Sequence, residues 1–92
     1  MANTPDLVGA FTPYTCNISK TAHKVFQEAT DGLLGVRYEL VAVSQQLVAG
    51  VNYKFFCNSE AVTQFPLNGA AIVSIYKPLE GRAHVTHIQP IN

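Results

Sequence analysis

Apolar residues recur at spacings of three and four near the start of the chain, which is the pattern of one face of a helix. Asn17 or Ser19 can cap the start of this helix, and Asp31-Gly32 or Gly35 can end it. The pattern predicts one amphipathic helix over about residues 17–34. Its apolar stripe consists of Ile18, Ala22, Val25, Phe26, Ala29 and Leu33.

After Gly35 the pattern changes to one that is typical of strands. Residues 36–50 are rich in Val, Leu and Tyr and carry no helical stripe. In the next segment, 51–58, alternate side chains share a face, and the more apolar face is predicted to look at the helix. That face consists of Val51, Tyr53, Phe55 and Cys57.

Two further strands are predicted in the last third of the chain. Residues 59–69 contain Ser, Glu, Thr, Pro and Gly and are predicted to form a connecting loop. Strands at 69–77 and 82–89 follow, with a turn at 78–81 between them. In the last strand, Ala83, Val85 and His87 are expected on one face and the residues between them on the other.

These elements predict a single domain over residues 1–92. Residues 1–15, with two prolines, form an N-terminal arm, and antiparallel strands occupy about 36–89. One amphipathic helix must bury its stripe against one face of a sheet. The expected class is therefore α+β, with one helix packed on a four- to five-stranded antiparallel sheet.

Composition narrows the classes of function. Hydrophobic residues make up 48% of the chain and charged residues 13%, which suits a folded domain that keeps apolar surface for a partner. Six basic residues balance six acidic ones, so neither nucleic acid nor a membrane surface is an expected partner. The first residues show no signal peptide, so the protein is expected in the cytoplasm if the chain is complete and outside the cell if it is a mature form.

Residues that could carry out catalysis are sparse. His84 and His87 are predicted on opposite faces of one strand, and His23 lies on the polar face of the helix. There is no glycine-rich phosphate loop and no nucleophile motif. We expect no enzyme activity, no cofactor and no metal site.

The two cysteines, Cys16 and Cys57, leave two alternatives open. They are two buried thiols, or they form one disulfide that ties the N-terminal segment to the sheet. Closing such a loop would stabilise the fold by roughly 3–4 kcal/mol.

The segment QLVAGVNY, residues 46–53, resembles the first inhibitory hairpin of the cystatins, whose motif is Q-x-V-x-G followed by Val or Thr, Asn and Tyr. Gln46, Val48 and Gly50 fill the motif, and residues 52–53 extend it. Leu7-Val8-Gly9 is similar to the N-terminal trunk of that family. Residues 75–81 are similar to its second hairpin, with Leu79 where many secreted members have Trp.

The resemblance implies a cystatin-like fold and reversible, tight-binding inhibition of papain-like, cathepsin-type cysteine peptidases. An arm and two hairpins would form an apolar wedge that enters the active-site cleft. The residues implied to bind the peptidase are Leu7, Val8, Gly9, Gln46, Leu47, Val48, Ala49, Gly50, Pro78 and Leu79. Gly50→Arg is expected to abolish inhibition and leave the fold intact.

Some features depart from the family pattern. The two C-terminal disulfides of secreted animal cystatins are absent, the helix is short, and Leu79 replaces Trp. Leu79 and the short helix favour an alternative, a cystatin-fold structural or protein-interaction module without inhibitory activity. We also expect a monomer that can form a domain-swapped dimer by opening the hairpin at Val48.

Overall fold

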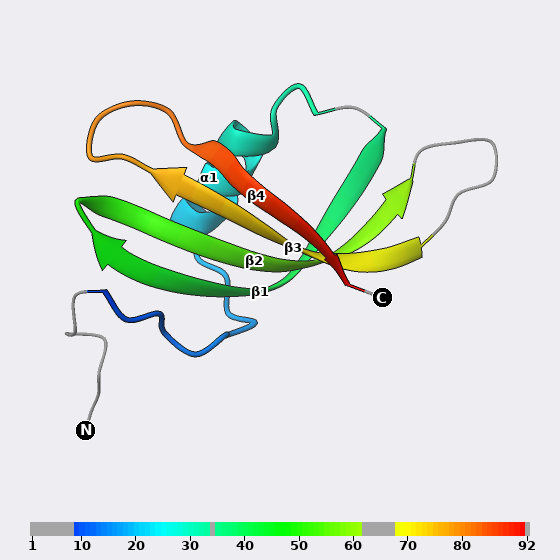
Figure 1. Ribbon diagram of the computed structural model, residues 1–92, viewed down its shortest axis with the longest axis horizontal. Coiled ribbons are helices and arrows are strands. Elements are labelled where there is room, and N and C mark those ends of the chain that lie inside the picture. The colour runs from blue at the N-terminus through cyan, green and yellow to red at the C-terminus, as the bar shows by residue number, and fades with distance from the viewer. Residues whose placement is uncertain (1–8, 34, 62–67, 92) are drawn as a thin grey trace.

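The computed structural model describes residues 9–33, 35–61 and 68–91, and within these ranges a single helix lies on one face of a four-stranded sheet (Figure 1). The helix α1 spans Lys20–Thr30, and the strands are β1 (Val36–Val48), β2 (Gly50–Ala61), β3 (Asn68–Lys77) and β4 (His84–Ile91). All neighbouring strands are antiparallel, in the order β1-β2-β3-β4. The α+β class predicted from the sequence is confirmed.

Helix α1 is shorter at both ends than the predicted 17–34. Ser19 is its N-cap, and the Ser19 hydroxyl accepts a hydrogen bond from the backbone N–H of Ala22 at 3.1 Å. The helix ends at Thr30, because the next residue, Asp31, has a non-helical ψ of 126°. Leu33 consequently lies outside the helix and is 45% exposed, so it does not belong to the buried stripe.

The strands are longer than the composition suggested. The predicted loop at 59–69 is wrong at both ends, because β2 continues through Ala61 and β3 begins at Asn68. Glu60 pairs with Asn68, and Ser59 pairs with Gly69. Cross-strand pairing therefore overrides the turn-like composition of these residues; residues 62–67 lie outside the described ranges.

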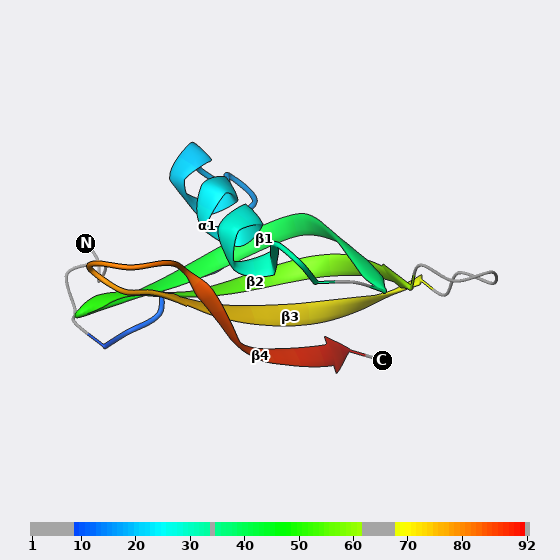
Figure 2. The same cartoon turned by 90° about the horizontal axis from the view of Figure 1, so that it is seen from above.

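The core lies between α1 and the sheet (Figure 2). Phe26 of the helix packs edge-to-face against Phe55, with ring centroids 5.0 Å apart, and Tyr53 stacks beside Phe55. The predicted inward face of β2 is confirmed, since Tyr53, Phe55 and Cys57 are all buried. The largest side chains on neighbouring strands that are excluded from solvent are Val43, Val73 and Ile75.

A β-bulge in the last strand changes which side chains share a face. Ser74 pairs with His87 but Ile75 pairs with Val85, so Thr86 is the extra residue. Val85 and Ile88 both pack against the core as a result. The predicted alternation along β4 is therefore wrong beyond Val85.

Candidate functional site

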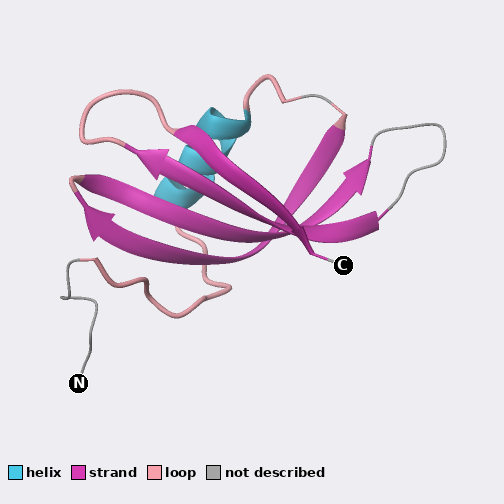
Figure 3. Ribbon diagram, in the orientation of Figure 1, coloured by secondary structure: helices cyan, strands magenta, loops and turns pink. Residues whose placement is uncertain are grey.

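Three connections predicted to act together meet at one end of the sheet. The β1–β2 hairpin turns at Ala49, the β3–β4 loop carries Pro78 and Leu79, and the arm approaches β1 at Gly9 (Figure 3). We call this the apolar end. It comprises Gly9, Leu47, Val48, Ala49, Gly50, Pro78 and Leu79. Of the other predicted residues, Gln46 lies next to this end on β1, and Leu7 and Val8 lie outside the described residues.

The residues of the apolar end differ in what they present to solvent. Leu79 is 78% exposed and Leu47 is 56% exposed, and Ala49 at the hairpin tip is also exposed. Val48 is half-buried and Gly50 is buried. The apolar surface that a partner can touch on the two hairpins is therefore formed mainly by Leu47, Ala49 and Leu79.

Gly50 is required by packing inside the chain. Its φ of +106° belongs to a region that residues with a side chain rarely adopt. A Cβ at this position would lie 2.5 Å from the carbonyl oxygen of Lys77 and 3.0 Å from Cα of Pro78. The expectation that Gly50→Arg leaves the fold intact is therefore wrong, because the two hairpins would have to separate.

Two side chains of β3 brace these hairpins, and the sequence pattern did not single them out. The Tyr76 hydroxyl donates a hydrogen bond to the carbonyl of Ala49 at the tip of the first hairpin. The Lys77 ammonium donates to the carbonyl of Gly81 at 2.7 Å and to that of Pro78 at 3.2 Å. The only available signal was their position directly before the Pro-x-x-Gly turn.

The arm runs antiparallel to the free edge of β1. Thr15 and Val43 exchange backbone hydrogen bonds of 3.0 and 2.9 Å, and the N–H of Thr12 donates to the carbonyl of Gln45 at 2.8 Å. The buried Ser44 hydroxyl donates to the carbonyl of Thr12 at 2.5 Å. The predicted extended arm is thus anchored over residues 12–15 and covers a segment of an edge strand.

Gln46 joins the arm to the first hairpin. Its Nε2 donates to the carbonyl of Gly9 at 2.7 Å, and its Oε1 accepts a hydrogen bond from Nδ2 of Asn52 at 2.8 Å. Phe11 pairs with Gln46 across the strand edge, and the ammonium of Lys54 lies 4.4 Å from the centre of the Phe11 ring. Charged and polar side chains from two strands therefore hold residues 9–11.

The histidines of β4 lie on the same face of the sheet, contrary to the sequence prediction. The bulge at Thr86 places both His84 and His87 on the face away from α1, because their partners Tyr76 and Ser74 both lie there. The His84 ring packs edge-to-face on Tyr76 at 5.8 Å between centroids. Within the described ranges, no group of three or more His, Cys, Asp or Glu side chains could hold a metal ion.

The cysteines are both free, so the disulfide alternative is wrong. The alternative of two buried thiols holds for Cys57 only, because Cys16 is exposed. Burial raises the pKa of the Cys57 thiol to about 12, and the thiol contacts the carbonyl of Phe55 at 3.5 Å. A thiol that stays protonated is a poor nucleophile.

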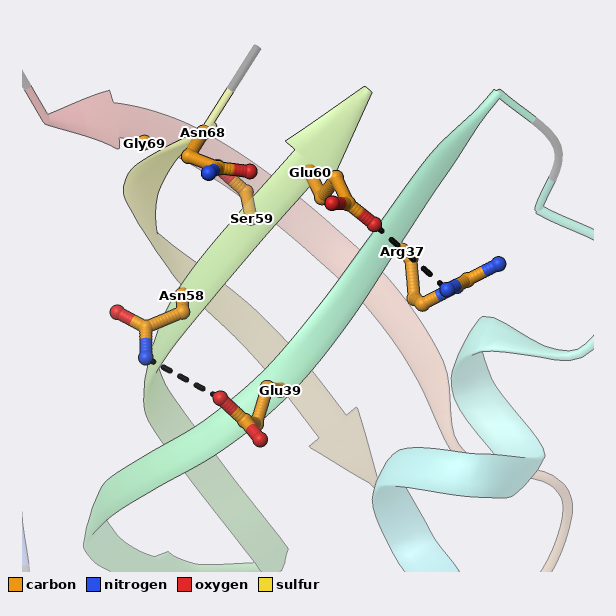
Figure 4. A pocket seen from close by; sticks show the side chains of 7 residues that line it. All are labelled: Arg37, Glu39, Asn58, Ser59, Glu60, Asn68 and Gly69. Atoms are coloured by element: carbon orange, nitrogen blue, oxygen red, sulfur yellow. Dashed lines mark hydrogen bonds and ion pairs between the residues drawn. The ribbon is translucent and has the colours of Figure 1, made fainter. Parts of the chain in front are cut away.

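A polar hollow of about 400 Å³ lies at the opposite end of the sheet (Figure 4). Four of its lining side chains are already paired with each other: Arg37 with Glu60 at 3.6 Å, and Asn58 with Glu39 at 3.3 Å. It shares no residue with the apolar end. The hollow is therefore separate from the candidate site.

Comparison of the chain with protein-family models, with curated proteins and with solved structures gives no match. Among the described residues, no helix is long and apolar enough to cross a membrane. One helix on a four-stranded antiparallel sheet is consistent with a cystatin-like arrangement.

Proposed function

We propose that this chain is a cystatin-type inhibitor that binds papain-like cysteine peptidases reversibly and tightly. The observation that carries the proposal is the convergence of the first hairpin, the second hairpin and the end of the arm in the apolar end. In the sequence, the Leu7-Val8-Gly9 trunk, the QLVAGVNY segment and the Pro78–Gly81 turn follow one another in the chain order of the cystatins.

The geometry suits a wedge that enters a cleft. Exposed Leu47, Ala49 and Leu79 offer apolar side chains to subsites on both sides of a catalytic thiolate. The carbonyl of Ala49 and that of Gly9 are held by side chains of the same chain. Because these internal bonds fix the apolar end before binding, docking loses little conformational entropy, which favours high affinity from a modest contact area.

We also propose that the chain has no catalytic activity of its own. The Cys57 thiol is buried with a raised pKa, and the histidines of β4 are exposed on the face away from the core. Neither the buried thiol nor the exposed histidines form a nucleophile that is paired with a general base. No nucleic acid, membrane or cofactor belongs to the proposal.

Papain titration tests the proposed function. The chain is expected to inhibit papain with a dissociation constant in the nanomolar to micromolar range, and Leu47→Ala is expected to weaken inhibition by about tenfold or more. Val36→Ala is the matched control, because this exposed residue lies on the same strand at the opposite end of the sheet. No inhibition at high micromolar concentration would contradict the proposal.

Leu79 in place of Trp favours one alternative function, a protein-interaction module on the same fold without inhibitory activity. The large ring that anchors such interfaces is missing from the second hairpin. The papain titration separates the two functions. An inhibitor reduces papain activity and does so less well after Leu47→Ala, whereas an interaction module does not inhibit papain at all.

A further inference from the structure

We infer that Gln46 is a positioning residue that locks the arm to the first hairpin and strengthens inhibition through the arm, without touching the peptidase. The inference rests on the proposed function and changes the role of a residue that the sequence assigned to peptidase contact. Its support is the hydrogen bonding of one carboxamide between two segments that are far apart in the sequence.

Each end of the Gln46 carboxamide makes one hydrogen bond inside the chain. Nε2 donates to the carbonyl of Gly9, and Oε1 accepts from Asn52, which lies directly opposite Gln46 in the β1–β2 ladder. A carboxamide carries donors on one end and an acceptor on the other. The Asn52 donor therefore selects the orientation in which Gln46 points its own donor at Gly9.

Gly9 is attached to the hairpin through both of its backbone polar groups. Its N–H donates to the carbonyl of Leu47 at 3.3 Å, and its carbonyl accepts the 2.7 Å bond from Gln46. The N–H is therefore not free to pair with the backbone of a peptidase, and one of the two lone pairs of the carbonyl is already used. Gly9 thus acts as an anchor point, and the peptidase contacts of the arm fall to Leu7 and Val8.

The bond from Gln46 matters because the next backbone anchor of the arm is at Thr12. Between the two anchors, Phe11 is held by the ammonium of Lys54. If Gln46 no longer donates, only the 3.3 Å backbone bond to Leu47 still holds Gly9 on the hairpin. The arm would then have to be ordered on binding, which lowers affinity.

Gln46→Glu tests this role with little change of size. The carboxylate can still accept from Asn52, but it offers no donor to Gly9 and repels the Gly9 carbonyl. We expect papain affinity to fall about three- to tenfold, the effect of one lost hydrogen bond with some loss of order. Gln89→Glu is the matched control, because it adds the same charge at an exposed position on β4, the edge of the sheet opposite to β1 and the arm.

The same substitution in a chain with Leu7→Ala and Val8→Ala separates positioning from direct contact. That arm has lost its apolar side chains, so its position should no longer matter. We expect Gln46→Glu to change affinity by less than about twofold in this background. An equal loss in both backgrounds would overturn the inference, because Gln46 would then act through the hairpin or the peptidase itself.

Backbone relaxation measured by NMR on the free, full-length chain gives a readout that needs no peptidase. We expect the order parameter of Gly9 to be near the rigid value of about 0.85 and to fall below about 0.6 in Gln46→Glu only. An unchanged order parameter of Gly9 in that variant would overturn the inference that Gln46 holds the arm. If the unsubstituted chain does not inhibit papain, the proposed function is wrong, and so is the claim that Gln46 strengthens inhibition. The relaxation measurement still decides whether Gln46 holds the arm.

Discussion

At the scale of single residues, the positions that shape the apolar end are defined by their neighbours inside the chain. Gly50 is buried against the end of β3, whereas Leu79 makes so little contact that it is 78% exposed. A residue of the first kind can be changed only by moving the backbone. A residue of the second kind can be changed with little effect on the fold.

Gly50→Ala should destabilise the fold by about 2–4 kcal/mol, because the new Cβ combines an unfavourable φ with contact to the carbonyl of Lys77. Gly32→Ala is the matched control. Its φ of +88° is similar, but nothing lies within 4 Å of the new Cβ, so it should cost only about 1 kcal/mol. Urea unfolding of both variants measures the difference, and equal losses would show that the contact with β3 is unimportant.

Leu79→Trp should increase affinity for papain by roughly 1–2 kcal/mol, because an indole ring offers a larger apolar anchor than Leu. The fold should be unchanged, since the side chain at this position is mostly exposed. Inhibition constants of Leu79→Trp and Leu33→Trp provide the comparison. Leu33 is also exposed but lies in the connection between α1 and β1. No gain at position 79, or an equal gain at both positions, would contradict this assignment.

Stability at high pH should report the burial of Cys57. Its pKa is raised from 9.0 to about 12 in the folded chain, so the stabilising effect is complete below pH 9 and is lost as the pH rises toward 12. Over that range the free energy of unfolding should fall by up to about 1.4 kcal/mol per pH unit from this group. Urea unfolding at pH 8 and pH 10 should show a smaller fall for Cys57→Ala than for Cys16→Ala, and equal falls would contradict the prediction.

At the scale of elements, the arm behaves as a partial fifth strand that covers one edge of the sheet. It pairs with β1 at Phe11 and Thr15 and is fastened between them by Thr12. The sequence predicted an extended arm but not its register, because residues 9–15 carry no alternating pattern of their own. The register follows from polar groups on β1, above all Ser44 and Gln46.

Ser44→Ala should loosen the arm and cost about 1 kcal/mol of stability, since it removes the donor to the Thr12 carbonyl at a site that is 2% exposed. Amide exchange at Thr12 and Thr15 should become faster, while exchange in β2 and β3 should not change. Ser74→Ala on the same face of the sheet is the control, because Ser74 lies on β3, away from the arm. Unchanged exchange in the Ser44 variant would mean that backbone pairing alone holds the arm.

At the scale of the whole molecule, β1 and β2 form one long ladder, which has a register shift between Leu40 and Ala42 and turns at Ala49. If the hairpin opens, these two strands can join into one, and the same pairs can form with a second copy of the chain. The exchanged dimer would have no first hairpin and so no intact apolar end. Gly50 would also leave its close contact with Lys77.

Mild heating should therefore convert a fraction of the protein to a domain-swapped dimer that does not inhibit papain. Size exclusion with light scattering measures the dimer, and titration of each separated species measures inhibition. A heated sample that stays monomeric, or a dimer that inhibits as well as the monomer does, would contradict this prediction.

The sequence alone determined the elements and their faces, because helical and strand periodicity are local properties. The stripe around Val25 and Phe26 and the alternation through Phe55 were sufficient to predict an α+β domain. They also placed the two hairpins in the right order. The ends of α1 and the extent of β2 and β3 were less predictable, because a cap or a cross-strand partner decides them.

Only the tertiary structure decided how the predicted site is assembled. The bulge at Thr86, the contact of Gly50 with β3, and the hydrogen bond from Gln46 to Gly9 all depend on strand register and on residues distant in the sequence. The periodic pattern of apolar residues describes a single strand or helix, so it contains no information about contacts between residues that are distant in the sequence. Long-range pairing therefore determined which motif residues are exposed and which hold the chain together.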